Sequence, residues 1–343
     1  AGEVNGRVSE ARLLAAYTNL SRRLQYTAGI FQEPFYYGQS YLTELDQQSE
    51  SFREDVILTR YVQRQAFGVA IYPLNRFTRA EFGARLTAVD RTEQFFSRKL
   101  SPLATDYFEE DSVLSHGSVT YAQPYFAWVS DNVLYGFSAP IMGRRYRFQV
   151  EPAVGRYQWI DYLADYRRYD PIIFNMLTVA TRVMASVSVG RDADTLRKYI
   201  GYSSIVRGYE RETFNSVANS CAPSASAQRA RCSPLLGSRV LVGNIELRFP
   251  LVRRADIGGL LSLPPIEGLV FYDAGVAWFS GQKVRLRPGE VSDPQAVRSL
   301  LTSHGFGLRV NLFNFAILRW DYAIPHQAPV KDGYWRFSLG PSF

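Results

Sequence analysis

Three ionisable residues far apart in the sequence, Arg207, Glu246 and Asp273, form the pattern with the clearest chemical meaning. Arg207 lies in Val-Arg-Gly-Tyr at the opening of a long polar stretch, and the two carboxylates lie inside downstream segments of alternating polarity. A guanidinium held between two carboxylates makes short, charge-assisted and bidentate bonds, which position a segment and transform no substrate. The glycine after the arginine, Gly208, permits a tight turn. The alternative is that Arg207 is an ordinary surface arginine in a turn.

No motif for catalysis or cofactor binding is found, and we predict neither enzymatic activity nor a cofactor nor a metal. The sequence lacks a nucleophile elbow, a P-loop and a zinc-protease helix motif. The three histidines, His116, His304 and His326, are widely separated. Ten residues separate Cys221 from Cys232 in a polar stretch without histidine, which favours a disulfide in an oxidising compartment over free thiols.

Composition excludes several classes of protein. A chain that is 46% hydrophobic and 21% charged is not disordered. The mean hydropathy of -0.16, without an apolar run near the ~18 residues of a spanning helix, excludes a helical membrane protein. The net charge of +7 is scattered among apolar residues, with no polybasic run, so we expect no nucleic-acid partner. The aromatic share of 14% is high for a soluble domain.

Alternation with a period of two residues dominates the chain and predicts strands. In 145–155, for example, Tyr146, Phe148 and Val150 alternate with Arg147 and Gln149. We expect thirteen strands and no helix. The predicted strands are 11–19, 22–33, 64–73, 76–89, 118–130, 145–155, 158–170, 177–189, 239–250, 267–280, 305–312, 315–325 and 334–343.

These strands fit a membrane barrel better than a soluble β-sandwich or β-propeller. Several keep their alternation over the ~9–11 residues that cross a bilayer at a tilt, and their polar face is rich in Arg and Glu. We predict an all-β transmembrane antiparallel up-and-down β-barrel of about 16 strands, with about 21 residues for each strand and its connection. Short links at 18–21 and 73–76 contrast with long polar ones, which we expect on the exterior. These are 33–54, 92–116, 209–238 and 281–303.

The chain ends in an alternating segment, Tyr334 to Phe343, with aromatic and apolar residues on one face. Those residues include Trp335, Phe337, Leu339 and Phe343. A terminal phenylalanine on such a strand resembles the C-terminal assembly signal of bacterial outer-membrane barrels. The alternative, an edge strand of a soluble sheet, would expose an aggregation-prone edge.

The order of motifs carries a further resemblance. Val-Arg-Gly-Tyr, Asn-Ile-Glu-Leu-Arg-Phe-Pro, Phe-Tyr-Asp-Ala-Gly, a Gly-x-Gly-x-Arg strand and a terminal aromatic follow one another over 200–343. This order resembles the outer-membrane assembly factor superfamily of the BamA, TamA and two-partner secretion transporter type. The resemblance implies one outer-membrane barrel domain over 1–343, with a plugging loop at approximately 200–238. It also implies that Arg207, Gly208 and Tyr209 form an ionic latch with Glu246 and Asp273.

The resemblance implies insertion or translocation of polypeptides at the bacterial outer membrane through a weak seam between the first and last strands. The expected partners are outer-membrane lipid, client polypeptides, and periplasmic or outer-membrane proteins, and the chain would be a bacterial surface antigen. The tandem periplasmic modules of BamA are not in this sequence, so a periplasmic region ahead of residue 1 is left open, and with it the insertase role. The alternative is a structural anchor or conduit without translocation; a passive porin is disfavoured by the plugging loop.

Overall fold

A computed structural model describes most of the chain. The described residues are 2–3, 12–46, 51–100, 110–136, 138–174, 176–195, 197–210, 213–214, 231–253, 255–257, 261–289, 293–312 and 316–340. Among them, no helix is long and apolar enough to cross a membrane.

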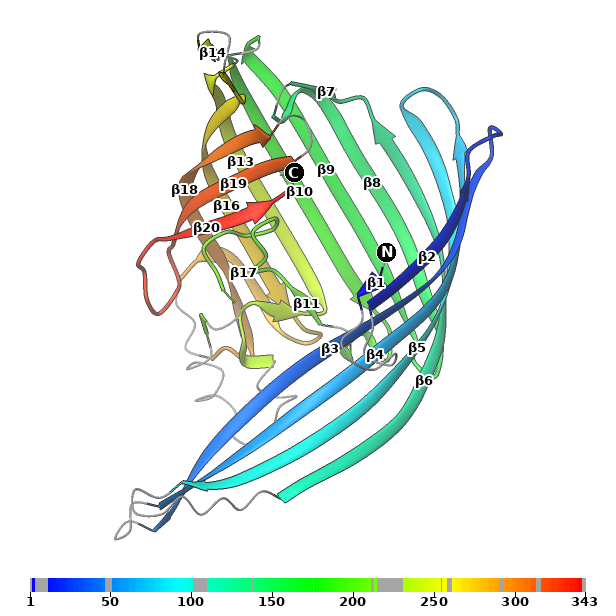
Figure 1. Ribbon diagram of the computed structural model, residues 1–343, viewed down its shortest axis with the longest axis vertical. Helices are drawn as coiled ribbons and strands as arrows, with labels where there is room; N and C mark the ends of the chain where they lie inside the picture. Colours follow the sequence, from blue (N-terminus) through cyan, green and yellow to red (C-terminus); the bar gives the residue numbers. More distant parts are fainter. Residues whose placement is uncertain are drawn as a thin grey trace. The chain divides into compact units, whose positions relative to one another are not determined.

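The described chain is nearly all strand, and sixteen strands belong to one sheet (Figure 1). Fourteen of these strands form a linear antiparallel path in chain order. They are β1 (Gly2–Glu3), β2 (Arg12–Asn19), β3 (Gln25–Asp46), β4 (Ser51–Pro73), β5 (Thr78–Leu100), β6 (Glu110–Asp131), β8 (Pro140–Gly155), β9 (Trp159–Ile173), β10 (Leu177–Val189), β13 (Arg239–Val252), β16 (Ile266–Trp278), β18 (Val297–Leu312), β19 (Ala316–Pro325) and β20 (Tyr334–Leu339). The prediction of an all-β antiparallel sheet of about 16 strands is confirmed.

The remaining strands are short and lie off this path. β7 (Leu134–Tyr135) pairs with β8, and β17 (Lys283–Pro288) pairs in parallel with β18. Two small separate sheets are formed by β11 (Lys198–Tyr199) with β12 (Leu236–Gly237), and by β14 (Ala255–Ile257) with β15 (Leu261–Leu263). The path begins at β1 and ends at β20, and no pairing of these two strands is found among the described residues. Closure of the sheet into a barrel stays a prediction.

The two faces of the sheet are inverted relative to a soluble protein. On β13 the polar residues Asn244, Glu246 and Arg248 are buried, whereas Ile245 between them is 48% exposed. The same inversion holds on β18, where Arg309 is fully buried and Phe306 is 47% exposed. Alternation places successive side chains on opposite faces, and large apolar side chains in such numbers on an outer face require an apolar surrounding. The inverted faces therefore favour lipid contact.

Three predicted loops are largely strand. In 281–303 the strand residues belong to β17 and to the first part of β18. β3 extends to Asp46 and β4 begins at Ser51, so most of 33–54 is paired. β5 extends to Leu100 and β6 begins at Glu110, so most of 92–116 is also strand. The polar composition that suggested loops is accommodated because polar side chains pair with one another, as Arg53 does with Asp55 and with Ser97 of the neighbouring strand.

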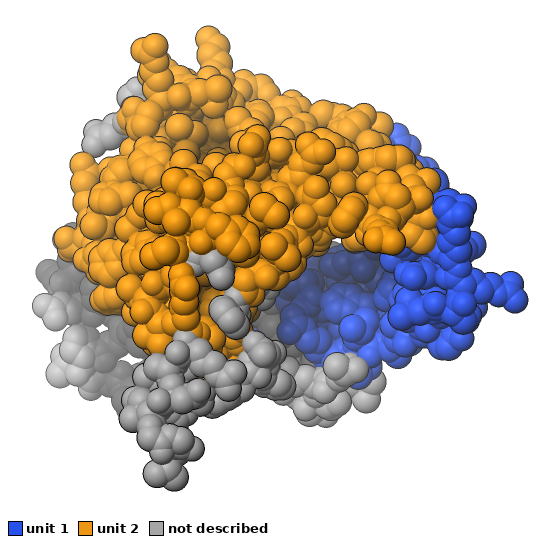
Figure 2. Space-filling model, turned by 90° about the horizontal axis from the view of Figure 1, so that it is seen from above, with its two compact units in different colours: residues 1–72, 81–125, 152–158 blue, residues 73–80, 126–151, 159–343 orange. Residues whose placement is uncertain are grey.

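The chain divides into two compact units, coloured separately in Figure 2. The first unit comprises residues 1–72, 81–125 and 152–158, and contains most of the long strands β3 to β6. The second unit comprises 73–80, 126–151 and 159–343. In the second unit, residues of the connection between β10 and β13 pack against the sheet and form a hydrophobic core. Its buried members are Met184, Ile200, Val206, Tyr209, Phe214, Leu235, Val240, Val242, Ala277, Leu301 and Ala328.

The exposed face of β13 generates a test of lipid contact. Ile245 near the middle of the strand and Leu251 near its end are both exposed. An arginine on the lipid face of a barrel costs ~2–4 kcal/mol at the midplane and ~0–1 kcal/mol near the interface. We therefore expect Ile245→Arg to lower the free energy of unfolding by about 2–4 kcal/mol and Leu251→Arg by less than about 1 kcal/mol.

The measurement is equilibrium denaturant unfolding of the protein reconstituted in lipid vesicles. Leu251→Arg is the matched control, because it places the same residue type on the same strand. Equal losses for the two variants would count against a membrane midplane near Ile245.

Candidate functional site

The connection between β10 and β13 returns to the sheet and carries the predicted latch residues. Its ends are tied by the β11–β12 pairing and by the hydrogen bond from the amide of Ile200 to the carbonyl of Leu235. The amide of Val206 donates to the carbonyls of Ile200 and Tyr202, at 3.1 Å in each case. These bonds form a compact turn, which we call the loop tip (residues 200–209).

Two glycines allow the loop tip to approach the sheet. Gly208 has a φ of 89°, a backbone conformation that side chains other than glycine rarely adopt. A Cβ atom on Gly275 of β16 would lie 2.5 Å from Cγ2 of Val206, so a larger residue would push the loop tip away.

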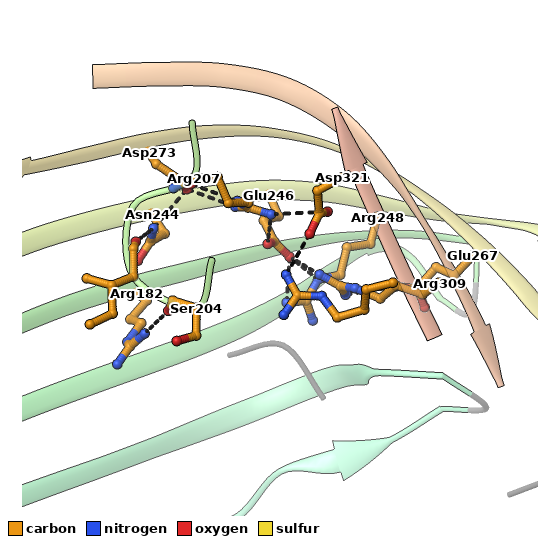
Figure 3. A network of polar contacts seen from close by, with 12 residues as sticks. Arg182, Ser204, Arg207, Asn244, Glu246, Arg248, Glu267, Asp273, Arg309 and Asp321 are labelled. Carbon is orange, nitrogen blue, oxygen red and sulfur yellow. Dashed lines mark hydrogen bonds and ion pairs between the residues drawn. The ribbon is translucent and has the colours of Figure 1, made fainter. Parts of the chain in front are cut away.

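Arg207 points from the loop tip into the buried face of the sheet (Figure 3). Its Nε lies 2.7 Å from Oδ2 of Asp273 and its Nη2 lies 2.8 Å from Oδ1, which is a bidentate pair. Its Nη1 lies 2.8 Å from Oε1 of Glu246, and its guanidinium carbon lies 3.5 Å from the ring centroid of Phe271. The structure therefore brings together the three residues selected from the sequence.

Glu246 is the residue on which these contacts converge. Besides Arg207, two arginines pair with its carboxylate: Nη2 of Arg248 lies 2.8 Å from Oε2, and Nη2 of Arg309 lies 2.6 Å from the same oxygen. Glu246 is 1% exposed. A carboxylate out of water needs such partners, because desolvation of an uncompensated charge costs several kcal/mol. Glu246 is thus held by three guanidiniums and Asp273 chiefly by one, so the two carboxylates are not equivalent.

Further buried residues extend this network, and sequence reasoning did not select them. Asn244 donates through Nδ2 to Asp273 and to the carbonyl of Ile205, at 2.8 and 2.7 Å. Asp321 Oδ1 lies 3.8 Å from Nη1 of Arg207, and Asp321 pairs with Arg319 at 2.9 Å. Their inward phase in the strand pattern predicts that they are buried, but their partners depend on strand register.

We define the ion cluster as four arginines and four carboxylates joined by these contacts. Its members are Arg207, Arg248, Arg309, Arg319, Glu246, Glu267, Asp273 and Asp321. The formal charges of the cluster cancel when all eight groups are ionised. Burial acts to lower the pKa of Arg207, but Asp273 and Glu246 outweigh it and hold that pKa above its ordinary value.

Tyr209 fixes the other side of the loop tip. It is fully buried, and its hydroxyl oxygen lies 2.8 Å from the carbonyl oxygen of Thr302 and 3.0 Å from Oε1 of Gln327. Its ring stacks on Phe214 with centroids 6.0 Å apart. Burial raises the pKa of Tyr209 to about 12. The tyrosine therefore stays neutral and contributes packing and hydrogen bonding, with no charge.

A second set of contacts, which we call the loop stem, holds the connection near its return to β13. Arg298 of β18 donates from Nε to Gln282 Oε1 at 3.0 Å and from Nη1 to the carbonyl of Ser233 at 2.5 Å, and from Nη2 to the carbonyl of Arg231. Asp194 accepts from Ser238 Oγ at 2.6 Å and from Arg231 Nη1 at 3.0 Å. Burial acts to raise the pKa of Asp194, but these bonds hold it below its ordinary value.

The other predicted sites are described in part. Cys232 is buried, and Cys221 lies outside the described residues, so the disulfide stays a prediction. Trp335, Phe337 and Leu339 are exposed on one face of β20, and Phe343 lies outside the described residues. Over the side chains that the structure describes, no group of three or more His, Cys, Asp or Glu could hold a metal ion.

The fold and the loop define a class of protein: a long antiparallel sheet with exposed apolar and buried ionic faces, and an arginine-tipped loop against the ionic face. The family model described as "Omp85 superfamily domain" matches residues 8–343, and the chain belongs to this superfamily. A comparison with curated proteins finds no match.

A comparison with solved structures finds similar chains, of which BamA shares the fold. BamA from Haemophilus ducreyi lacking POTRA domains 1-3 matches with a TM-score of 0.55 and 12% identity, over 95% of this chain and 68% of that chain. CdiB from Acinetobacter baumannii matches with a TM-score of 0.39 and 13% identity, over 96% of this chain and 59% of that chain. CdiB from Escherichia coli matches with a TM-score of 0.41 and 10% identity, over 97% of this chain and 60% of that chain.

The unequal partners of the two carboxylates predict unequal mutant effects. Glu246→Gln leaves three buried guanidiniums short of a partner, and breaking a buried ion network from one side costs ~3–5 kcal/mol. Arg207→Gln leaves Glu246 with Arg248 and Arg309. Asp273 keeps Asn244, and withdrawal of the untied loop tip would let water solvate this carboxylate, which limits the cost of its unpaired charge. We expect Glu246→Gln to lower the free energy of unfolding by about 3–5 kcal/mol and Arg207→Gln to lower it by clearly less.

The measurement is denaturant unfolding of both variants in the same detergent or lipid. Asn244→Ala, which removes a neutral partner of the same cluster, is the control for loss of packing. A larger loss for Arg207→Gln than for Glu246→Gln would contradict the central position of Glu246.

Proposed function

We propose that this chain is a bacterial outer-membrane β-barrel that inserts or translocates polypeptides, with the Arg207 loop as a releasable plug. The observation that carries the proposal is the buried loop tip, tied by Arg207 to Glu246 and Asp273 in a chain of the Omp85 superfamily. The likeness to BamA supports the fold of this barrel. The exposed apolar face of the strands supports an outer surface in lipid.

The ion cluster suits a latch that opens and closes. Buried ion pairs contribute little net stability relative to apolar packing, but they define one arrangement of their partners. Release of Arg207 leaves Glu246 paired with two arginines, so Glu246 itself stays compensated while the loop tip is away. Asp273 then loses its bidentate partner, which favours return of the arginine. The cluster therefore favours the latched state without preventing release.

The ends of the strand path supply the proposed seam. β20 is short, with six residues, and pairs with β19 on one edge. In lipid, backbone groups without partners cost several kcal/mol each, so an edge strand at a weak seam gains by pairing with a client strand. Addition of a strand to an exposed edge is a general mode of polypeptide recognition. We propose that a client polypeptide pairs at this seam.

The plug generates a test in planar lipid bilayers. Arg207→Gln is expected to increase the frequency and size of open-channel events, because the loop tip loses its charged contacts. Arg207→Lys is expected to have an intermediate effect, since lysine keeps the charge but cannot form the bidentate pair. Arg168→Gln is the matched control, because Arg168 is exposed and pairs with Asp170 outside the ion cluster. Large steady currents from the unmodified protein would instead favour a porin.

The seam generates a test of client handling. The test is a disulfide cross-link between the last strand and an early strand. One cysteine replaces Ser338 of β20, and the other replaces Ala16 of β2 or Glu3 of β1. Both are introduced into a chain whose Cys221 and Cys232 are replaced by serine. Oxidation is expected to stop client assembly or secretion in cells, and a reductant is expected to restore it. Assembly that continues when the cross-link has formed would contradict the seam and favour a structural anchor or conduit.

A further inference from the structure

Two histidines that are far apart in the sequence meet where the pairing of β18 with β19 ends. Nδ1 of His304 lies 2.6 Å from Nε2 of His326, and the two ring centroids are 4.8 Å apart. His304 belongs to β18, and His326 follows the last residue of β19. Neither contacts Arg207 or the other members of the ion cluster through the interactions of the described residues, although Thr302 and Gln327 beside the pair also bond to Tyr209 of the loop tip.

The backbone holds the two rings in place. His304 is the register partner of Ile324, and the amide of His326 donates to the carbonyl of Thr302 at 3.0 Å. The antiparallel ladder therefore continues to His326, and the two histidines occupy diagonal positions on one face. Sites built on paired strands are positioned more rigidly than sites on free loops.

Thr302 and Gln327 border the ring of His326. Oε1 of Gln327 accepts from the amide of Thr302 at 2.6 Å and lies 3.2 Å from Oγ1 of Thr302. Oγ1 of Thr302 lies 2.9 Å from Nδ1 of His326. When the threonine hydroxyl donates to Gln327, Oγ1 accepts from Nδ1 of His326, and the lone pair of Nε2 then points toward His304.

Metal ions bind the neutral imidazole of histidine. His304 has an exposed side chain, and His326 lies in the connection that follows β19, which gives an ion a route to the pair.

We propose that His304 and His326 chelate a divalent transition-metal ion. When Nδ1 of His304 carries no proton, two nitrogen lone pairs converge, and a cation between them relieves their repulsion. Imidazole suits Zn²⁺, Cu²⁺ and Ni²⁺. With metal–nitrogen distances of about 2.0–2.1 Å, the two nitrogens need a separation of about 2.9–3.3 Å, which requires the rings to open slightly.

Thr302 acts as a positioning residue in this proposal. A ligating histidine commonly donates its other ring N–H to a fixed acceptor, which orients the ring, and loss of that acceptor weakens metal binding by ~10–100-fold. Water or a further ligand would complete the coordination. The bound ion would join β18 to the start of the connection between β19 and β20.

The experiment is calorimetric titration of NiCl₂ and ZnCl₂ into the tag-free full chain in detergent micelles. We expect one ion per chain. His304→Gln and His326→Gln should each abolish this binding, and Thr302→Val should weaken it by about 10–100-fold. His116→Gln, which removes the remaining histidine, is the matched control and should bind normally.

Circular dichroism and heat-dependent mobility on gels establish that each variant is folded before titration. Absence of stoichiometric binding to the unmodified chain would overturn the proposal. Binding that survives both His304→Gln and His326→Gln would also overturn it, because another group would then hold the ion. Neither outcome affects the proposed plug or seam.

Discussion

The structure of the second unit depends on neutralising one carboxylate, Glu246, away from water. A buried carboxylate is tolerated only when cations compensate it, and three guanidiniums do so here. Two of them come from the sheet, from β13 and β18, and the third comes from the loop tip. The same charge requirement thus links β13 to β18, which lie on either side of β16, and links both to the connection that returns to them. The return of the loop is a consequence of this electrostatic requirement as much as of apolar packing.

The loop is held at two places by interactions of different kinds. At the loop tip, Arg207 makes ion pairs with two carboxylates, whose partners can be exchanged within the ion cluster. At the loop stem, Arg298 donates to backbone carbonyls and to a neutral amide. Breaking these bonds would leave a buried guanidinium without hydrogen-bond partners, and such a group costs free energy. The stem is therefore the more permanent attachment, and the tip is the part suited to move in the proposed function.

The long strands of the first unit exceed the length that a membrane span needs. β3 has 22 residues, which extend about 70 Å at ~3.3 Å per residue. Tilted by ~45°, such a strand still rises about 50 Å, against a hydrocarbon core of ~30 Å. A substantial part of it would lie in water. Near the same ends of the neighbouring strands, Arg53 of β4 contacts Asp55 of its own strand and Ser97 of β5, and such polar contacts fit a watery environment.

Local alternation was sufficient to predict the sheet and the inward direction of Glu246 and Asp273, because side-chain direction in a strand repeats every two residues. The ends of β3 to β6 were not predictable in this way, since polar residues are compatible with both loops and paired strands in water. Nor could the sequence indicate that Arg309 and Asp321 join Glu246 and Arg207, or that His304 meets His326. Those contacts depend on strand register and on the path of the connections. Both are set by pairing between distant segments, which only the tertiary structure decides.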